Sequence, residues 1–155
     1  MVPKLAIRVA ELDDVAAMAA IAEEAYARYI ERVGCRPAPM DADFAAHVGR
    51  HEAYVIQDRH GIGGFIVTFP KIGGQFVENV AVATVRRGAG LGLKLCHFAE
   101  LEARRRKLPK VFLYTNVNMT ENLMYYDRLG YTETHRVTED GFERVYMEKL
   151  FTNEH

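Results

Sequence analysis

A cluster of glycines past the middle of the chain constrains the fold most strongly. Gly88, Gly90 and Gly92 follow a strand-like apolar run at 76–82 and open an amphipathic segment that ends in four basic residues at 104–107. Glycines allow positive φ and close backbone approach, and cations complement the negative end of a helix. The pattern therefore predicts a strand, a glycine turn and a helix in direct succession.

The N-terminal part is typical of a strand followed by two helices. After an apolar-rich run at 5–9, apolar residues recur every three or four positions over 15–33, and Gly34 is placed to end this helix. Two prolines exclude a regular helix in the next segment. Asp41 or Asp43 can then cap a second, shorter helix.

Further strands are predicted where β-branched and aromatic residues gather, at 53–57, 62–69, 111–114, 131–137 and 144–150. A helix at 121–129, capped by Asn118 or Thr120, separates two of these strands. The order is thus strand, two helices, three strands, helix, strand, helix and two strands. It fits an α/β sandwich built around one central sheet.

Composition narrows the class of protein. The chain has 155 residues, about half of them apolar, which is the usual size of one compact domain. Its 20 basic and 21 acidic residues give a net charge of −1, which argues against a protein that coats nucleic acid or an anionic membrane. Cys35 and Cys96 are too few for a disulfide framework. Since no apolar segment is typical of a leader or a membrane span, we expect a cytoplasmic protein.

The glycine segment predicts a phosphorylated ligand. Backbone N–H groups in the first turn of a helix lack intrahelical partners, and the helix dipole favours an anion there. No lysine followed by a hydroxyl residue occurs after the glycines, which disfavours a P-loop. The spacing of the glycines by twos also differs from the Gly-x-Gly-x-x-Gly of dinucleotide-binding domains.

Residues 87–92 instead read Arg-x-x-Gly-x-Gly, which resembles the pyrophosphate loop of the GNAT N-acetyltransferase superfamily. The preceding run at 77–82 looks like the fourth strand of that family, whose end separates from its neighbour and pairs with the pantetheine arm. Residues 114–116 and the Tyr-x-x-Leu-Gly-Tyr of 126–131 look like its fifth strand and fourth helix. The resemblance covers roughly the whole chain, although the N-terminal helices match only in type and order.

The resemblance implies an α/β, GNAT-type fold, with a mixed and mostly antiparallel sheet of about seven strands flanked by about four helices. It implies one N-acetyltransferase domain over residues 1–155 that moves an acetyl group directly from acetyl-CoA to a primary amine, without a metal. The acceptor would be a small-molecule amine or a peptide amine, and homodimers are common on this fold. The coenzyme-binding residues implied are Val80, Ala81, Val82, Arg87, Gly88, Ala89, Gly90, Leu91, Gly92 and Asn122.

The resemblance also implies two catalytic residues. Tyr126 occupies the tyrosine that commonly protonates the coenzyme sulfur, and its alternative is a half-buried helical tyrosine. Glu78 is the candidate base, since a carboxylate in an apolar strand can take a proton directly or through water. A structural ion pair or a solvent-facing position is an equal alternative for Glu78. A main-chain N–H near Val82 would meet the thioester carbonyl, and Tyr125 is expected in the core.

Other residues of the chain give weaker indications of function. His47 and His51 lie four residues apart, but the helix is expected to end between them, so a metal site is not expected. The acceptor pocket of this fold is usually built near the first helices, which makes Tyr26, Tyr29, Arg32, Met40 and Phe44 candidates for its lining. Two alternatives keep the fold without this chemistry: a catalytically silent CoA-binding sensor or regulatory module, and a purely structural protein.

Overall fold

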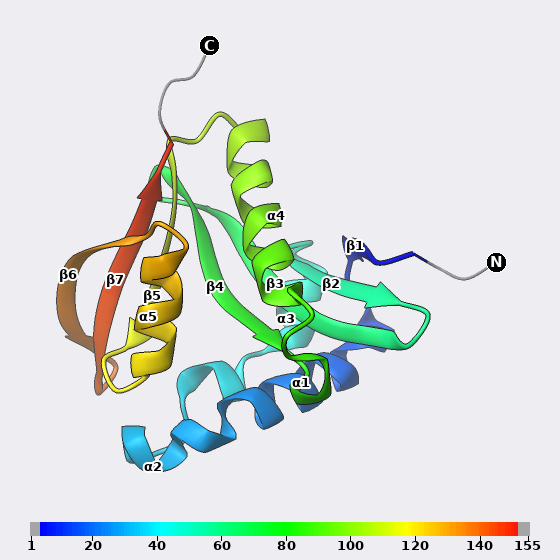
Figure 1. The fold of residues 1–155 in the computed structure, drawn as a ribbon, viewed down its shortest axis with the longest axis horizontal. Coiled ribbons are helices and arrows are strands. Elements are labelled where there is room, and N and C mark those ends of the chain that lie inside the picture. The colour runs from blue at the N-terminus through cyan, green and yellow to red at the C-terminus, as the bar shows by residue number, and fades with distance from the viewer. Residues whose placement is uncertain (1–3, 152–155) are drawn as a thin grey trace.

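The computed structural model describes residues 4–151 and contains one seven-stranded sheet (Figure 1). The strands are β1 (Ala6–Val9), β2 (Ala53–Asp58), β3 (Gly61–Lys71), β4 (Gly74–Val82), β5 (Lys110–Asn116), β6 (Thr132–Glu139) and β7 (Phe142–Leu150). They lie in the order β1-β2-β3-β4-β5-β7-β6. Neighbouring strands are antiparallel except for β4 and β5, which are parallel. The mixed, mostly antiparallel sheet predicted from the sequence is confirmed.

The first expected helix is interrupted once. It consists of α1 (Val15–Tyr26) and α2 (Ile30–Val33), joined by one 3-10 turn at Ala27–Tyr29. Side chains three residues apart align in a 3-10 turn, and here both Tyr26 and Tyr29 are buried. Gly34 adopts a left-handed φ of 88° and ends α2, as predicted.

The other helices are α3 (Phe44–Gly49), α4 (Leu91–Arg105) and α5 (Thr120–Arg128). Asp43 caps α3 by accepting from the N–H of Ala46 at 3.0 Å. The predicted cap of α5 was wrong, because Met119 holds that position and no side chain caps the helix. Asn118 instead donates its backbone N–H to the side chain of Asn116.

The helices bury two cores, one on each face of the sheet. Alternate residues of β2 show this, since Ala53 and Val55 join a core with α1 and α3, whereas Tyr54 and Ile56 join a core with α4 and α5. Figure 1 shows α4 and α5 on one side of the sheet and the N-terminal helices near its other side. The fold is therefore a three-layer α/β sandwich.

The sheet opens between its two parallel strands. β4 pairs with β5 only from Gln75 to Val77, and beyond these residues the two strands separate. On the other side of β4, the register with β3 shifts so that Val77 and Asn79 pair with successive residues of β3 and Glu78 is left over. Such a bulge re-aims a side chain and bends the strand. Glu78 thus lies where the pairing of β4 with β3 is interrupted and its pairing with β5 has ended.

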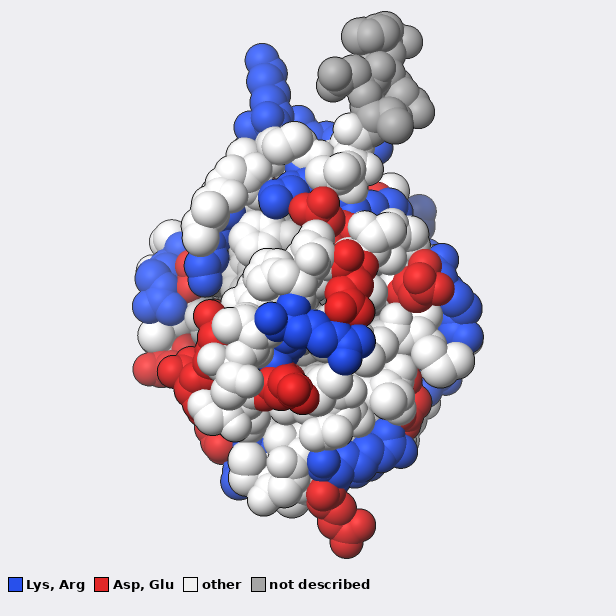
Figure 2. Space-filling model, turned by 90° about the vertical axis from the view of Figure 1, so that its left-hand side faces the viewer, with Lys and Arg blue, Asp and Glu red and all other residues white. Residues whose placement is uncertain are grey.

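Charges of both signs are interspersed over the surface shown in Figure 2. Neither sign forms a continuous patch on that face. No helix within residues 4–151 is both long and apolar enough to cross a membrane.

Candidate active site

The larger of two neighbouring cavities lies at the start of α4. Its volume is about 650 Å³, and it is lined by the end of β4, the glycine loop and α5. Gly88 and Gly90 have φ of 86° and 78°, so both occupy the left-handed region that glycine adopts without strain. Within the described residues, the N–H groups of Leu91, Gly92 and Leu93 have no acceptor. The cavity therefore presents free donors at the positive end of a 15-residue helix.

The mouth of this cavity at the helix start is open to an anion. A Cβ added to Gly92 would lie 3.0 Å from the hydroxyl oxygen of Tyr125, so glycine avoids a close contact in the first turn of α4. Arg87 is exposed at the rim and can approach an anion. Arg86 also lines the cavity, but it forms an ion pair with Asp58. Among the described residues, the guanidinium of Arg87 forms no ion pair, so it is the one of the two arginines that can bind a ligand.

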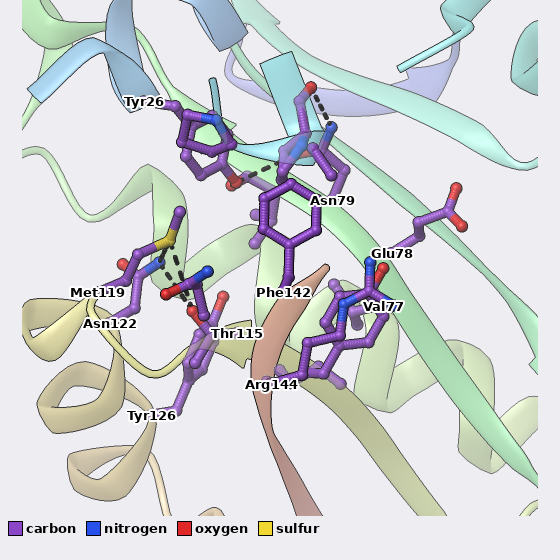
Figure 3. Close-up of a pocket in the computed structure, with 17 residues that line it drawn as sticks. Tyr26, Val77, Glu78, Asn79, Thr115, Met119, Asn122, Tyr126, Phe142 and Arg144 are labelled. Carbon is purple, nitrogen blue, oxygen red and sulfur yellow. Dashed lines mark hydrogen bonds between the residues drawn. The ribbon is translucent and has the colours of Figure 1, made fainter. Parts of the chain in front are cut away.

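A smaller cavity, of about 50 Å³, lies in the opening between β4 and β5. Tyr26, Val80, Asn122 and Tyr126 line both cavities, so the two meet at these side chains. In Figure 3, Tyr126 and Asn122 lie on one side, Glu78 and Arg144 lie on the other, and Phe142 stands between them. The arrangement brings the larger and the smaller cavity into contact at the open edge of β4.

Tyr126 is buried at this junction. Its side chain is 7% exposed, and burial raises the pKa of its hydroxyl well above the usual value, with a smaller contribution from Cys96. The hydroxyl makes no hydrogen bond within residues 4–151. A phenol in this state keeps its proton and can donate it to a group that enters the junction.

Glu78 is held by a histidine that the sequence did not connect with it. Its Oε2 lies 2.7 Å from Nε2 of His47, and Nδ1 of the same ring lies 2.5 Å from Oε1 of Glu52. Nη2 of Arg50 also lies 3.2 Å from Nδ1 of His47. Arg50 donates to the same oxygen of Glu52 at 2.9 Å. The Glu78 carboxylate, 34% exposed, is therefore oriented by its contact with a buried histidine that a second carboxylate holds in place.

Most of the predicted coenzyme residues lie around the larger cavity. All of them except Ala89 line it, and Asn122 lines both cavities. Tyr125, expected in the core, packs half-buried against the core of α4 and α5 and also lines the larger cavity, and burial raises its pKa to about 12. Its hydroxyl approaches Gly92 because α5 packs beside the start of α4, and a contact between two helices leaves no local pattern in the sequence.

The candidates for the acceptor lining are mostly placed elsewhere. Met40 and Phe44 are buried in the core beneath α1, and Arg32 forms an ion pair with Glu121. Tyr29 lines the larger cavity. Of the five, Tyr26 alone lines the smaller cavity, where its hydroxyl donates to the carbonyl oxygen of Val80 at 3.0 Å.

Solved structures share this fold over nearly the whole chain. The ribosomal-protein-S18-alanine N-acetyltransferase of Escherichia coli is 20% identical, with a TM-score of 0.76 over 98% of this chain and 97% of that one. The PaiA N-acetyltransferase of Thermoplasma acidophilum, in complex with coenzyme A, is 13% identical, with a TM-score of 0.79 over 96% and 99%. A putative streptothricin acetyltransferase of Bacillus anthracis, in complex with acetyl coenzyme A, is 17% identical, with a TM-score of 0.72 over 96% and 100%.

The family is identified by comparing the sequence with known families and proteins. No curated protein matched it. The acetyltransferase (GNAT) domain matches residues 49–133, which is more than half of the chain and includes the bulge of β4, the glycine loop and α5. With this match and the shared fold, the chain belongs to the GNAT family of acetyltransferases.

Proposed function

We propose that the protein transfers an acetyl group directly from acetyl-CoA to a primary amine. The observation that carries the proposal is the junction of the two cavities at Val80 and Tyr126. A coenzyme bound along the larger cavity would extend its acyl end to this junction, and an amine in the smaller cavity would meet it there. Positioning of two reactants in this way removes much of the entropic cost of their encounter.

The glycine loop and α4 hold the coenzyme in this proposal. The N–H groups of Leu91, Gly92 and Leu93 bind the diphosphate together with Arg87, and the open edge of β4 from Val80 to Val82 pairs with the pantetheine arm. Acetyl-CoA supplies the acetyl group as an activated thioester. Asn122 lines both cavities, so its amide is placed to contact the arm near the junction.

Tyr126 and Glu78 move the protons. Tyr126 retains its proton because it is buried, and it donates this proton to the sulfur that leaves. Glu78 receives the proton of the acceptor amine through a water molecule, because its carboxylate is turned toward His47 rather than toward Tyr126. His47 and Glu52 act as positioning residues for Glu78.

Isothermal titration of acetyl-CoA into the wild-type protein and Arg87→Ala tests the coenzyme site. We expect saturable binding that Arg87→Ala weakens roughly tenfold, since a charge-assisted phosphate contact is worth about 1.5–3 kcal/mol and this one is exposed. Arg59→Ala removes an exposed arginine from the turn between β2 and β3 and should bind like the wild type. A folded protein that does not bind acetyl-CoA at millimolar concentration would refute the proposal.

Turnover separates an enzyme from a coenzyme sensor on the same fold. Release of CoA thiol in the presence of an amine panel is expected from an enzyme. Tight binding of acetyl-CoA without thiol release for any amine would leave the sensor as the function.

A further inference from the structure

The acceptor side of the sheet carries polar groups that the proposed chemistry does not use. Along β5, Val111, Leu113 and Thr115 are buried toward α4 and α5, whereas Phe112, Tyr114 and Asn116 face the opposite side. Arg144 pairs directly with Asn116 across β5 and β7, so both side chains project to that side. Both also line the smaller cavity.

Arg144 is buried but only partly paired. Its side chain is 11% exposed, and its guanidinium stacks on Tyr114, with Cζ 4.2 Å from the ring centroid. Within the described residues, Nη1 alone meets carboxylates, at 3.4 Å from Glu139 and 3.5 Å from Asp140. Those distances are long for a charge-assisted bond. Nε and Nη2 therefore carry free donors into a cavity.

The carboxylates of Glu139 and Asp140 do not provide strong hydrogen bonds to the guanidinium of Arg144. The oxygen of Glu139 that faces Arg144 also accepts from the hydroxyl of Tyr146 at 2.6 Å. The side chain of Asp140 is 84% exposed, and exposed ion pairs contribute little. Neither Nε nor Nη2 is among the fully buried atoms without a partner, so both donors are accessible from the cavity and can meet an acceptor group that arrives with a ligand.

Asn116 adds a second donor beside it. Its Oδ1 accepts from the backbone N–H of Asn118 at 2.9 Å, which orients the amide and leaves its NH₂ without a partner in residues 4–151. Glu78 lines the same cavity with the opposite charge, and Figure 3 shows Arg144 rising from β7 toward it. The two do not form an ion pair in the described structure. The cavity thus offers a cation and an amide at one place and an anion nearby.

We propose that Arg144 and Asn116 bind a carboxylate of the acceptor, which makes the acceptor a small amine with a carboxylate close to its amino group, as in an amino acid. This inference rests on the proposed function. The planar fork of a guanidinium matches the two oxygens of a carboxylate. Glu78 then faces the ammonium group of the same molecule, so both ends of a zwitterion meet complementary charges. Simple polyamines and amides lack the group that Arg144 binds.

Matched acceptors test the inference directly. A panel of amino acids is compared with the corresponding amino acid amides, with release of CoA thiol as the readout, for the wild type, Arg144→Gln and Asn116→Ala. We expect the wild type to favour the acids by roughly 10- to 100-fold in kcat/KM, and Arg144→Gln to reduce the ratio of kcat/KM for acid over amide to about one. Arg144→Lys should restore only part of it, because an ammonium group lacks the fork.

Controls separate this inference from the proposed function. Arg136→Gln removes an exposed arginine of β6 that pairs with Glu133, and it should keep the preference. Titration of acetyl-CoA into every variant reports folding and the coenzyme site independently. Normal binding of acetyl-CoA combined with equal use of acids and amides would overturn the carboxylate site and leave the acetyltransferase proposal intact.

A binding experiment covers the case in which no panel amine turns over. N-acetyl amino acids and their amides are added to the CoA-loaded protein and followed by ligand-observed NMR. Binding that depends on the carboxylate and is lost in Arg144→Gln supports the site. Binding that is the same for acids and amides, or absent for both, overturns it.

Discussion

At the scale of single residues, Tyr126 is distinguished by its position rather than by its type. Three neighbouring tyrosines pack edge to face, with ring centroids 5.5 Å apart for Tyr125 and Tyr126 and for Tyr126 and Tyr131. Tyr125 lines only the larger cavity, and the hydroxyl of Tyr131 is buried without a partner. Tyr126 is the member of the cluster that lines both cavities.

We therefore predict that Tyr126→Phe lowers kcat by about 10²- to 10⁴-fold, the usual contribution of a general acid, and leaves acetyl-CoA binding unchanged. Tyr131→Phe is the matched control, because it removes a hydroxyl from the same cluster outside the cavities. Steady-state kinetics with titration of acetyl-CoA measures both quantities. Equal loss of activity in the two variants would show that Tyr126 acts through packing alone.

The contact between His47 and Glu78 predicts a positioning role. His47→Gln removes a ring that bridges Glu52 and Glu78, with Arg50 as the remaining charged neighbour. We expect kcat/KM to fall about tenfold and its pH profile to change in shape, because the carboxylate of Glu78 loses the ring that contacts and orients it. His97→Gln, on the outer face of α4, should change neither. A loss of thermal stability with an unchanged pH profile would assign His47 to structure only.

At the scale of elements, the close approach of β3, β4 and α4 depends on Gly64. A Cβ at this position would lie 2.8 Å from the carbonyl oxygen of Ala81 and 3.2 Å from Cδ1 of Leu95. The first of these contacts is with backbone, which cannot rotate away. We predict that Gly64→Ala lowers the free energy of unfolding by about 1–3 kcal/mol, as overpacking of a core does.

Urea unfolding measures this loss against Gly49→Ala. Gly49 ends α3 in an ordinary conformation, and a Cβ there would meet no atom within 4 Å. Alanine at Gly49 should change the free energy of unfolding by less than about 1 kcal/mol, in the stabilising direction. Equal urea midpoints for the two variants would contradict the prediction. They would show that β3 and β4 move apart to accept the methyl group without loss of stability.

Elements whose signal is local were predicted from the sequence. The glycine loop and α4 depend on residues adjacent in the chain, and Gly34 and Gly90 have the left-handed φ that their positions required. The break between α1 and α2 was missed, because the apolar period continues through it and the 3-10 turn is set by burial of Tyr26 and Tyr29. Tertiary packing decided that boundary.

The candidate site was predictable only where it is continuous in sequence. His47 and Glu78 meet because α3 packs beside a bulge whose position depends on the register of β3 and β4. Arg144 and Asn116 are neighbours because of the register of β5 and β7. Register between distant strands leaves no local pattern, so residues that the register brings together stay hidden until the fold is known.

At the scale of the whole molecule, buried phenols link stability to pH. Burial is the first cause of a raised pKa for the following tyrosines: Tyr26, Tyr54, Tyr114, Tyr125, Tyr126, Tyr131 and Tyr146. The pKa reaches about 12 for Tyr125 and Tyr146. These tyrosines lie in α1, α5 and the sheet, or directly before β6, so the effect belongs to the fold as a unit.

The sign follows from proton counting. An unfolded tyrosine titrates near pH 10, so above about pH 10 the unfolded chain loses protons that the folded protein retains. The stabilising contribution is complete below this pH and is lost as the pH rises toward the folded values. We predict that the urea midpoint is nearly constant from about pH 8 to 10 and falls steeply by about pH 11, with phenolate absorbance appearing together with unfolding. Tyr131→Phe should make the fall shallower, because one buried phenol is gone. A smooth phenolate titration near pH 10 in the folded protein, without loss of structure, would show that these hydroxyls reach solvent.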